Sequence, residues 1–176
     1  MKDTSEHIAL LAFRIRILLL IFIVGLVISG ATAIPLETEL RLLTQWSGGE
    51  SGLAEWFLKI RNALVETNAK YPFMAYGTDW LAFAHIVIAV AFIGPLRDPV
   101  KNIWVVEFGM IACVLVVPFV LVMGNVRKIP FGWRLIDCSF GVLGVIPLWF
   151  CLRLIKQLAV AEGGFGTCDT SAESGG

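Results

Sequence analysis

Apolar residues along the chain gather into four long blocks, and the stretches between the blocks are polar. Each block approaches the roughly 20 residues that a helix needs to cross the hydrocarbon core of a bilayer. Backbone groups in lipid must be paired within their own segment, so the pattern predicts transmembrane helices. The predicted spans cover about residues 11–33, 79–97, 102–125 and 130–156. The last span qualifies only if Arg134 and Asp137 are sheltered from lipid.

The connection between the first two spans has a different, helical periodicity. Apolar residues recur every three or four positions over residues 36–46 and again over 52–67, with charged residues on the opposite face. This spacing predicts two amphipathic helices, with a break at the Ser-Gly-Gly of residues 47–49. The two helices would lie on the membrane surface or cap the bundle, and a lid over a pocket is the alternative.

The other two connections are short, which makes neighbouring helices antiparallel. The predicted fold class is therefore all-α: an integral membrane four-helix bundle with two amphipathic helices in the first extramembrane connection. Residues 1–160 are expected to form a single transmembrane domain. Residues 161–176 are small and polar, so they are expected to be a disordered tail.

Composition narrows the class of partner. The 176 residues are 57% hydrophobic and 16% charged, against about 25% charged residues in soluble domains. The 14 basic and 14 acidic side chains cancel, so no basic patch argues for nucleic acid. The expected partner is the lipid bilayer, and a homo-oligomer or a larger membrane complex is left open. The first apolar block is longer than the core of a signal peptide, so we expect an uncleaved anchor.

Lys and Arg in the connections indicate the orientation in the membrane. The basic residues divide evenly between the two sides. Lys59 and Arg61 lie far inside a long connection and Arg134 can lie within the bilayer, so these three carry little weight. We therefore predict that both termini are cytoplasmic.

Ionisable residues inside the apolar blocks are the candidate functional residues, because they are costly in lipid and usually face a partner. His85 lies about two turns inside the second span, and Asp137 lies at a similar depth in the fourth. Arg134 precedes Asp137 by one turn, and Asp79 lies at the membrane surface above His85. We predict a polar cluster of His85, Arg134, Asp137 and Asp79, in which His85 touches Asp137 directly or through one water and Arg134 balances the carboxylate.

The cluster has two interpretations. It either staples the second and fourth spans together, or it serves as a proton relay or ligand site, since an imidazole beside a carboxylate can titrate near neutral pH. Glu107 is a secondary candidate near the cytoplasmic end of the third span. Its carboxylate would reach the membrane surface or pair with Arg153.

No catalytic, metal or cofactor set is complete in the sequence. The four cysteines contain no CxxC spacing, so they are expected to pack as small apolar residues. His7 and His85, the two histidines, are predicted on opposite sides, which excludes a bis-histidine haem within one chain. We expect no cofactor and a non-enzymatic role, as an accessory or assembly component or a small-solute carrier. The alternative is a membrane-bound enzyme or redox subunit that uses the cluster around His85, Arg134 and Asp137.

Small residues in the spans indicate where helix backbones come close together. The candidates are Gly25 and Ser29 in the first span, Gly109 and Cys113 in the third, and Gly141 and Gly144 in the fourth.

Two runs carry a family resemblance, GTDWLAFAHIVIAVAFIGPLRDPVKNIWVVEFGMIACV and IPFGWRLIDCSFGVLGVIPLW. They resemble a family of small, uncharacterised bacterial membrane proteins with four spans. The resemblance covers the last three spans, and it implies the bacterial inner membrane as the location. It implies no activity and no ligand.

Overall fold

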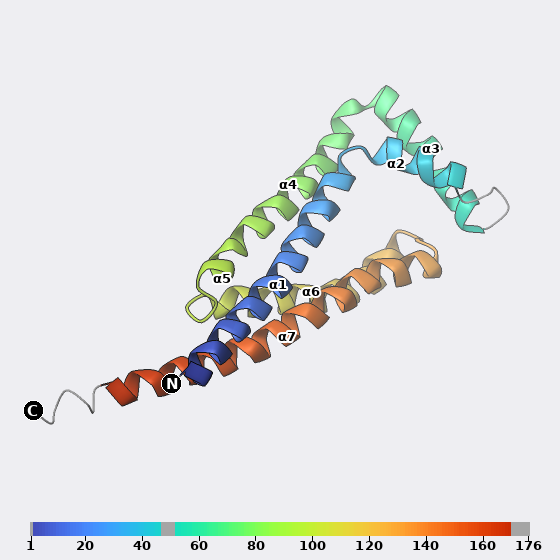
Figure 1. Cartoon of the computed structure of the whole chain (residues 1–176). Coiled ribbons are helices and arrows are strands. Elements are labelled where there is room, and N and C mark those ends of the chain that lie inside the picture. Colours follow the sequence, from blue (N-terminus) through green and yellow to red (C-terminus); the bar gives the residue numbers. More distant parts are fainter. Residues whose placement is uncertain (1, 47–51, 170–176) are drawn as a thin grey trace, which may run out of the picture. The chain divides into compact units, whose positions relative to one another are not determined.

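The computed structural model describes residues 2–46 and 52–169, which are almost entirely helical, with no β-strand among them (Figure 1). The helices are α1 (Lys2–Ala33), α2 (Leu36–Trp46), α3 (Gly52–Lys70), a short 3-10 helix (Pro72–Ala75), α4 (Tyr76–Ala91), α5 (Ile93–Arg97), α6 (Ile103–Val126) and α7 (Phe131–Asp169). Among these described residues, four segments are long and apolar enough to cross a membrane: Ser5–Ala33, Pro72–Arg97, Ile103–Val126 and Phe131–Gly163. The prediction of an all-α chain with four such helices is confirmed. The predicted break at residues 47–49 lies outside the described residues.

The chain divides into two compact units where the sequence led us to expect one domain. The first unit combines Met1–Ile23 with Val90–Gly176, and the second is Val24–Ala89. Helices α1 and α4 each contribute to both units, since each continues through a unit boundary.

The first unit is built on α6 and α7, which run side by side (Figure 1). Phe92 is fully buried at its centre, and its ring centroid lies 4.7 Å from that of Phe22. A Cβ placed on Gly109 would come within 2.6 Å of the Phe92 ring and 3.0 Å of Leu148. A larger residue at position 109 would force the Phe92 and Leu148 side chains to shift, because real Cβ atoms do not come so close to other atoms.

Cys113 of α6 marks a second close approach in this unit. A Cβ on Gly141 would lie 2.5 Å from the Cys113 carbonyl oxygen, and one on Gly144 would lie 2.7 Å from its Sγ. The predicted small-residue contacts at Gly109, Cys113, Gly141 and Gly144 are therefore confirmed.

The second unit contains α2, α3 and the adjoining parts of α1 and α4. Helices α2 and α3 pack together, with Leu40 and Ala54 buried. On α1, the expected contact residue Gly25 has no neighbour within 4 Å among the described residues. The close approach is instead at Gly30, where a Cβ would lie 2.9 Å from the Ala82 carbonyl oxygen of α4.

Two helix boundaries differ from the prediction. The second span is interrupted at Phe92, between α4 and α5. Pro95 explains the break, since its ring excludes the carbonyl four residues earlier and it has no N–H to donate. At the other end of the chain, α7 continues to Asp169, into the segment expected to be a disordered tail. Leu158, just before that segment, is buried, so the apolar face of α7 extends past residue 156, where the predicted span ends. Residues 170–176 of the predicted tail lie outside the described residues.

Candidate functional site

The five candidate residues are divided between the two units. Asp79 and His85 belong to α4 in the second unit, whereas Glu107 of α6 and Arg134 and Asp137 of α7 belong to the first. A contact between His85 and Asp137 would therefore join the two units, and it stays a prediction. Each group can be described within its own unit.

His85 is half-buried on α4 and bonds to its own helix. Its Nδ1 lies 2.8 Å from the Leu81 carbonyl oxygen one turn earlier. A carbonyl only accepts, so the Nδ1–H donates and Nε2 is the remaining ring nitrogen. The His85 Cβ lies 3.0 Å from the position that a Cβ on Gly30 would take. His85 thus lies at the contact between the last turn of α1 and the middle of α4.

Asp79 is exposed in the first turn of α4. A carboxylate there interacts favourably with the positive end of the helix dipole. His85 follows six positions later, which places the two side chains on different faces of the helix. Asp79 therefore lies in the first turn of α4 on a different face from His85, and its part in the predicted cluster stays a prediction.

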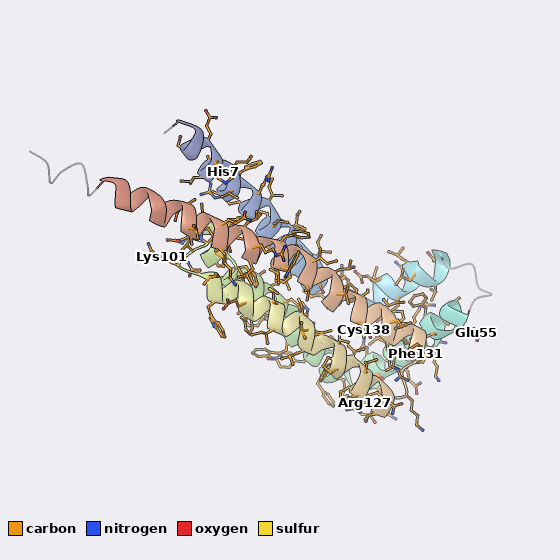
Figure 2. The ribbon with its side chains drawn as sticks, turned by 90° about the horizontal axis from the view of Figure 1, so that it is seen from below. His7, Glu55, Lys101, Arg127, Phe131 and Cys138 are labelled. Carbon is orange, nitrogen blue, oxygen red and sulfur yellow. The ribbon has the colours of Figure 1, made fainter. Side chains whose placement is uncertain are left out.

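The turn between α6 and α7 determines the hydrogen-bond partner of Arg134. The Ile129 N–H donates to the Gly124 carbonyl at 2.8 Å and the Lys128 N–H to the Asn125 carbonyl at 3.1 Å. With Lys128 in the left-handed region at φ 56°, this is the Schellman arrangement that ends many helices. Arg127 and Phe131 flank the turn, at the opposite end of α6 from Lys101 (Figure 2).

Arg134 closes this turn from the first turns of α7. Its Nε–H donates to the Ile129 carbonyl at 2.8 Å, and its Cδ lies 2.5 Å from where a Cβ on Gly124 would stand. The expected ion pair with Asp137 is not among those that the described residues form. Arg134 finds a nearer acceptor, because the Ile129 carbonyl just before α7 receives no backbone N–H of that helix.

Asp137 and Glu107 are both half-buried in the first unit. Within the described part of that unit, neither carboxylate has an ion-pair or hydrogen-bond partner. The alternative pairing of Glu107 with Arg153 is not formed there, since the Arg153 guanidinium instead lies 3.9 Å from the centroid of the Trp149 ring. Asp137 and Glu107 are thus two carboxylates in apolar helices without a partner in the described part of their own unit.

The connection between α5 and α6 holds polar residues that the sequence analysis passed over. The Asn102 side-chain amide donates to the Asp98 carbonyl at 2.9 Å and to the Gly94 carbonyl at 3.2 Å. The Asp98 carboxylate accepts from the Lys101 backbone N–H at 3.1 Å and pairs with its Nζ at 3.1 Å. These two bonds hold the pKa of the Asp98 carboxyl below its usual value. An Asp and an Asn four residues apart, between two apolar blocks, is the signal that indicates such a turn.

In residues 2–46 and 52–169, no group of three or more His, Cys, Asp or Glu side chains could hold a metal ion. Cys113, Cys138 and Cys151 are free thiols. Comparison with known proteins adds no assignment: no family model matches the chain, and neither the curated proteins nor the solved structures gave a match. The resemblance to small four-span bacterial membrane proteins therefore stays a prediction.

Proposed function

We propose that this protein is an integral membrane protein of the bacterial inner membrane, with four crossings and both termini in the cytoplasm. The exposed surface of the first unit supports this. On α6 the large apolar side chains of Phe119 and Val122 are 66% and 61% exposed, and on α7 Phe140 and Leu143 are 65% and 62% exposed. Apolar faces this wide need lipid or protein to cover them, because monomeric soluble proteins rarely expose contiguous patches of this kind.

Within the membrane, the protein acts as a non-enzymatic accessory or assembly component or as a small-solute carrier. One observation carries this proposal: two of the ionisable groups expected to form a site, His85 and Arg134, bond to nearby backbone. The His85 Nδ1 bonds to the Leu81 carbonyl and the Arg134 Nε to the Ile129 carbonyl. Such bonds fix a helix and a turn, whereas a catalytic base or acid needs a proton-transfer partner within reach.

A contact of His85 with Asp137, directly or through one water, belongs to the same proposal as a staple between α4 and α7. It rests on the matched depth of the two residues and on the cost of a lone carboxylate in lipid. Arg134 supports the staple indirectly, by holding the start of α7 at the turn.

A double-mutant cycle tests the staple. His85→Ala and Asp137→Ala should show a coupling energy of about 0.6 kcal/mol or more in the free energy of unfolding, the range of polar contacts between membrane helices. The matched control pairs His85→Ala with Glu107→Ala, which are predicted at opposite sides of the membrane, and it should show no coupling. Additive effects of His85→Ala and Asp137→Ala would contradict the proposed staple.

The second candidate is a membrane-bound enzyme or redox subunit, and the unpartnered Asp137 favours it. A carboxylate in an apolar segment is by default a functional group. Purification in mild detergent followed by mass spectrometry of proteins and small molecules separates the two candidates. The accessory role predicts stoichiometric membrane-protein partners, the carrier role predicts a bound solute, and neither predicts an absorption band. Asp137→Asn is the matched variant, and a Soret or flavin band lost in it would establish the redox alternative instead.

A further inference from the structure

A groove between α1 and α7 in the first unit combines basic and apolar side chains. It has a volume of about 460 Å³. Arg14, Arg153 and Gln157 give it a polar part, and Ile17, Phe150 and Leu154 give it an apolar part. No acidic side chain lines it among the described residues.

The two arginines of the groove have no acidic partner. Both side chains are exposed, and neither forms an ion pair in the part of the chain that the structure describes. The Arg153 guanidinium is held against the Trp149 ring at 3.9 Å, a cation–π contact that orders the side chain and leaves its charge uncompensated. Two guanidinium groups that share a groove without a counter-ion fit an anion there.

The depth of the groove identifies the kind of anion, on the premise of the membrane insertion proposed above. The helix from Phe131, the first residue of α7, to Arg153 rises about 33 Å at 1.5 Å per residue, close to the roughly 30 Å thickness of the hydrocarbon core. The helix from Arg14 to Ala33 rises about 28 Å. Arg14 and Arg153 therefore lie at one boundary of the hydrocarbon, on the side of the two termini, which is the level of lipid phosphates.

We propose that this groove binds one anionic phospholipid. The phosphodiester takes charge-assisted hydrogen bonds from Arg14 and Arg153, whose planar forks suit phosphate oxygens, and an additional hydrogen bond from the Gln157 amide. One acyl chain lies along Ile17, Phe150 and Leu154. A basic pocket between transmembrane helices on the cytoplasmic side is a recurrent form of lipid headgroup site.

The test uses the full chain in mild detergent and follows the thermal unfolding midpoint during titration with phosphatidylglycerol or with neutral phosphatidylcholine. Phosphatidylglycerol should raise the midpoint, and its apparent Kd should weaken about 30-fold in Arg14→Gln/Arg153→Gln. The matched control is Arg16→Gln/Lys156→Gln, which removes the same charge from exposed positions of the same two helices outside the groove. The control should bind as the wild type does. Arg14→Lys/Arg153→Lys keeps the charge without the fork, so its affinity should be intermediate.

Three results would overturn the proposal. Equal weakening in both double variants would mean diffuse charge attraction, equal binding of phosphatidylcholine would mean no headgroup recognition, and equal stabilisation by inorganic phosphate would mean that the acyl chain is not held. Failure of the membrane proposal is visible separately, as release of the wild-type protein from membranes at alkaline pH. If the protein is retained in membranes but shows no preference for phosphatidylglycerol, the lipid-binding proposal is overturned and the membrane proposal stands.

Discussion

Two helix pairs of this protein, α6 with α7 and α2 with α3, both bury residues between their helices but differ in the polarity of their outer surfaces. In α6, 24 residues include Glu107 as the one charged side chain, and Phe119 is 66% exposed. In α3, 19 residues include five charged ones, Glu55, Lys59, Arg61, Glu66 and Lys70. Each pair buries small or apolar residues between its helices, such as Gly109 in the first and Ala54 in the second.

The difference between the pairs lies in the medium that each outer face requires. Charged residues opposite an apolar stripe suit an interface with water, whereas an apolar face on all sides suits lipid. If the chain crosses the membrane as proposed, the first pair lies in lipid and the second in water. The predictions below change these pairs or the turns next to them.

The largest effect is expected from a charge on the outer face of α6. Leu115→Lys puts an ammonium at the middle of this helix, where Leu115 is 59% exposed. The insertion cost is about 3 kcal/mol, because a lysine at the centre of a span must be desolvated. Leu58→Lys, at a 40% exposed position of α3, is the control and should be neutral. Retention in membranes after alkaline extraction is measured for both variants. Equal retention would mean that the outer faces of α6 and α3 do not differ in the medium they require.

A smaller effect is expected where α6 and α7 touch. Gly141→Val forces a Cβ toward the Cys113 carbonyl oxygen, 2.5 Å away, and rigid backbone on both sides prevents relief. We expect a loss of about 2 to 3 kcal/mol in the free energy of unfolding. Gly132→Val on the same helix, with no neighbour within 4 Å among the described residues, should cost little. Unfolding titrations in detergent compare them, and similar losses would mean that α6 and α7 do not approach closely at Gly141.

A stabilising change is expected in the turn that joins α6 to α7. Lys128 has a φ of 56°, a conformation that glycine adopts without penalty. Lys128→Gly should therefore raise the free energy of unfolding by about 1 kcal/mol. Lys128→Ala removes the same charge and keeps the strained backbone, so it should give no gain. A gain in both variants would attribute the effect to charge and not to the backbone.

The smallest effect concerns the turn before α6 and depends on pH. The folded-state pKa of Asp98 is below its usual value, so its contribution to stability is present at neutral pH. That contribution disappears as the pH falls below the ordinary Asp value of about 3.9 and through the folded-state pKa. Asp98→Asn should thus lower the unfolding midpoint slightly at pH 7, and by less at pH 3. A difference as large at pH 3 as at pH 7 would assign the effect to the hydrogen bonds of the turn and not to the charge.

Helix positions could be predicted from the sequence wherever periodicity or apolar length is unambiguous. Residues 36–46 form α2 as predicted, and α6 begins and ends within one residue of the predicted span. The sequence did not predict the interruption at Phe92, because membrane helices tolerate proline. Whether Pro95 breaks the helix depends on the local backbone. The sequence placed the α1 contact at Gly25 and Ser29, whereas the structure has a close approach at Gly30, the residue after Ser29. Small residues indicate possible contacts without saying which one a neighbour uses.

The candidate site was harder to predict than the fold. Spacing favoured an Arg134–Asp137 pair, but the Schellman turn at Lys128 leaves the Ile129 carbonyl as a closer acceptor for Arg134. The choice of the Ile129 carbonyl over Asp137 depends on Lys128 being in the left-handed region. Lysine is uncommon there, so the sequence does not indicate this conformation. The groove at Arg14 and Arg153 was missed for a related reason, because the two residues are far apart in the chain and only the packing of α1 on α7 brings them together.

The claim that underlies this account is that the chain crosses the membrane between its polar connections. Cysteines introduced at Lys59, Lys101 and Arg127, which are all exposed, test it directly in a variant whose native cysteines are changed to alanine. A membrane-impermeant maleimide applied to intact cells should label positions 59 and 127 only, and inverted vesicles should be labelled at position 101 only. Labelling of all three positions from one side would contradict the account, and the reverse pattern would keep the crossings and invert the orientation.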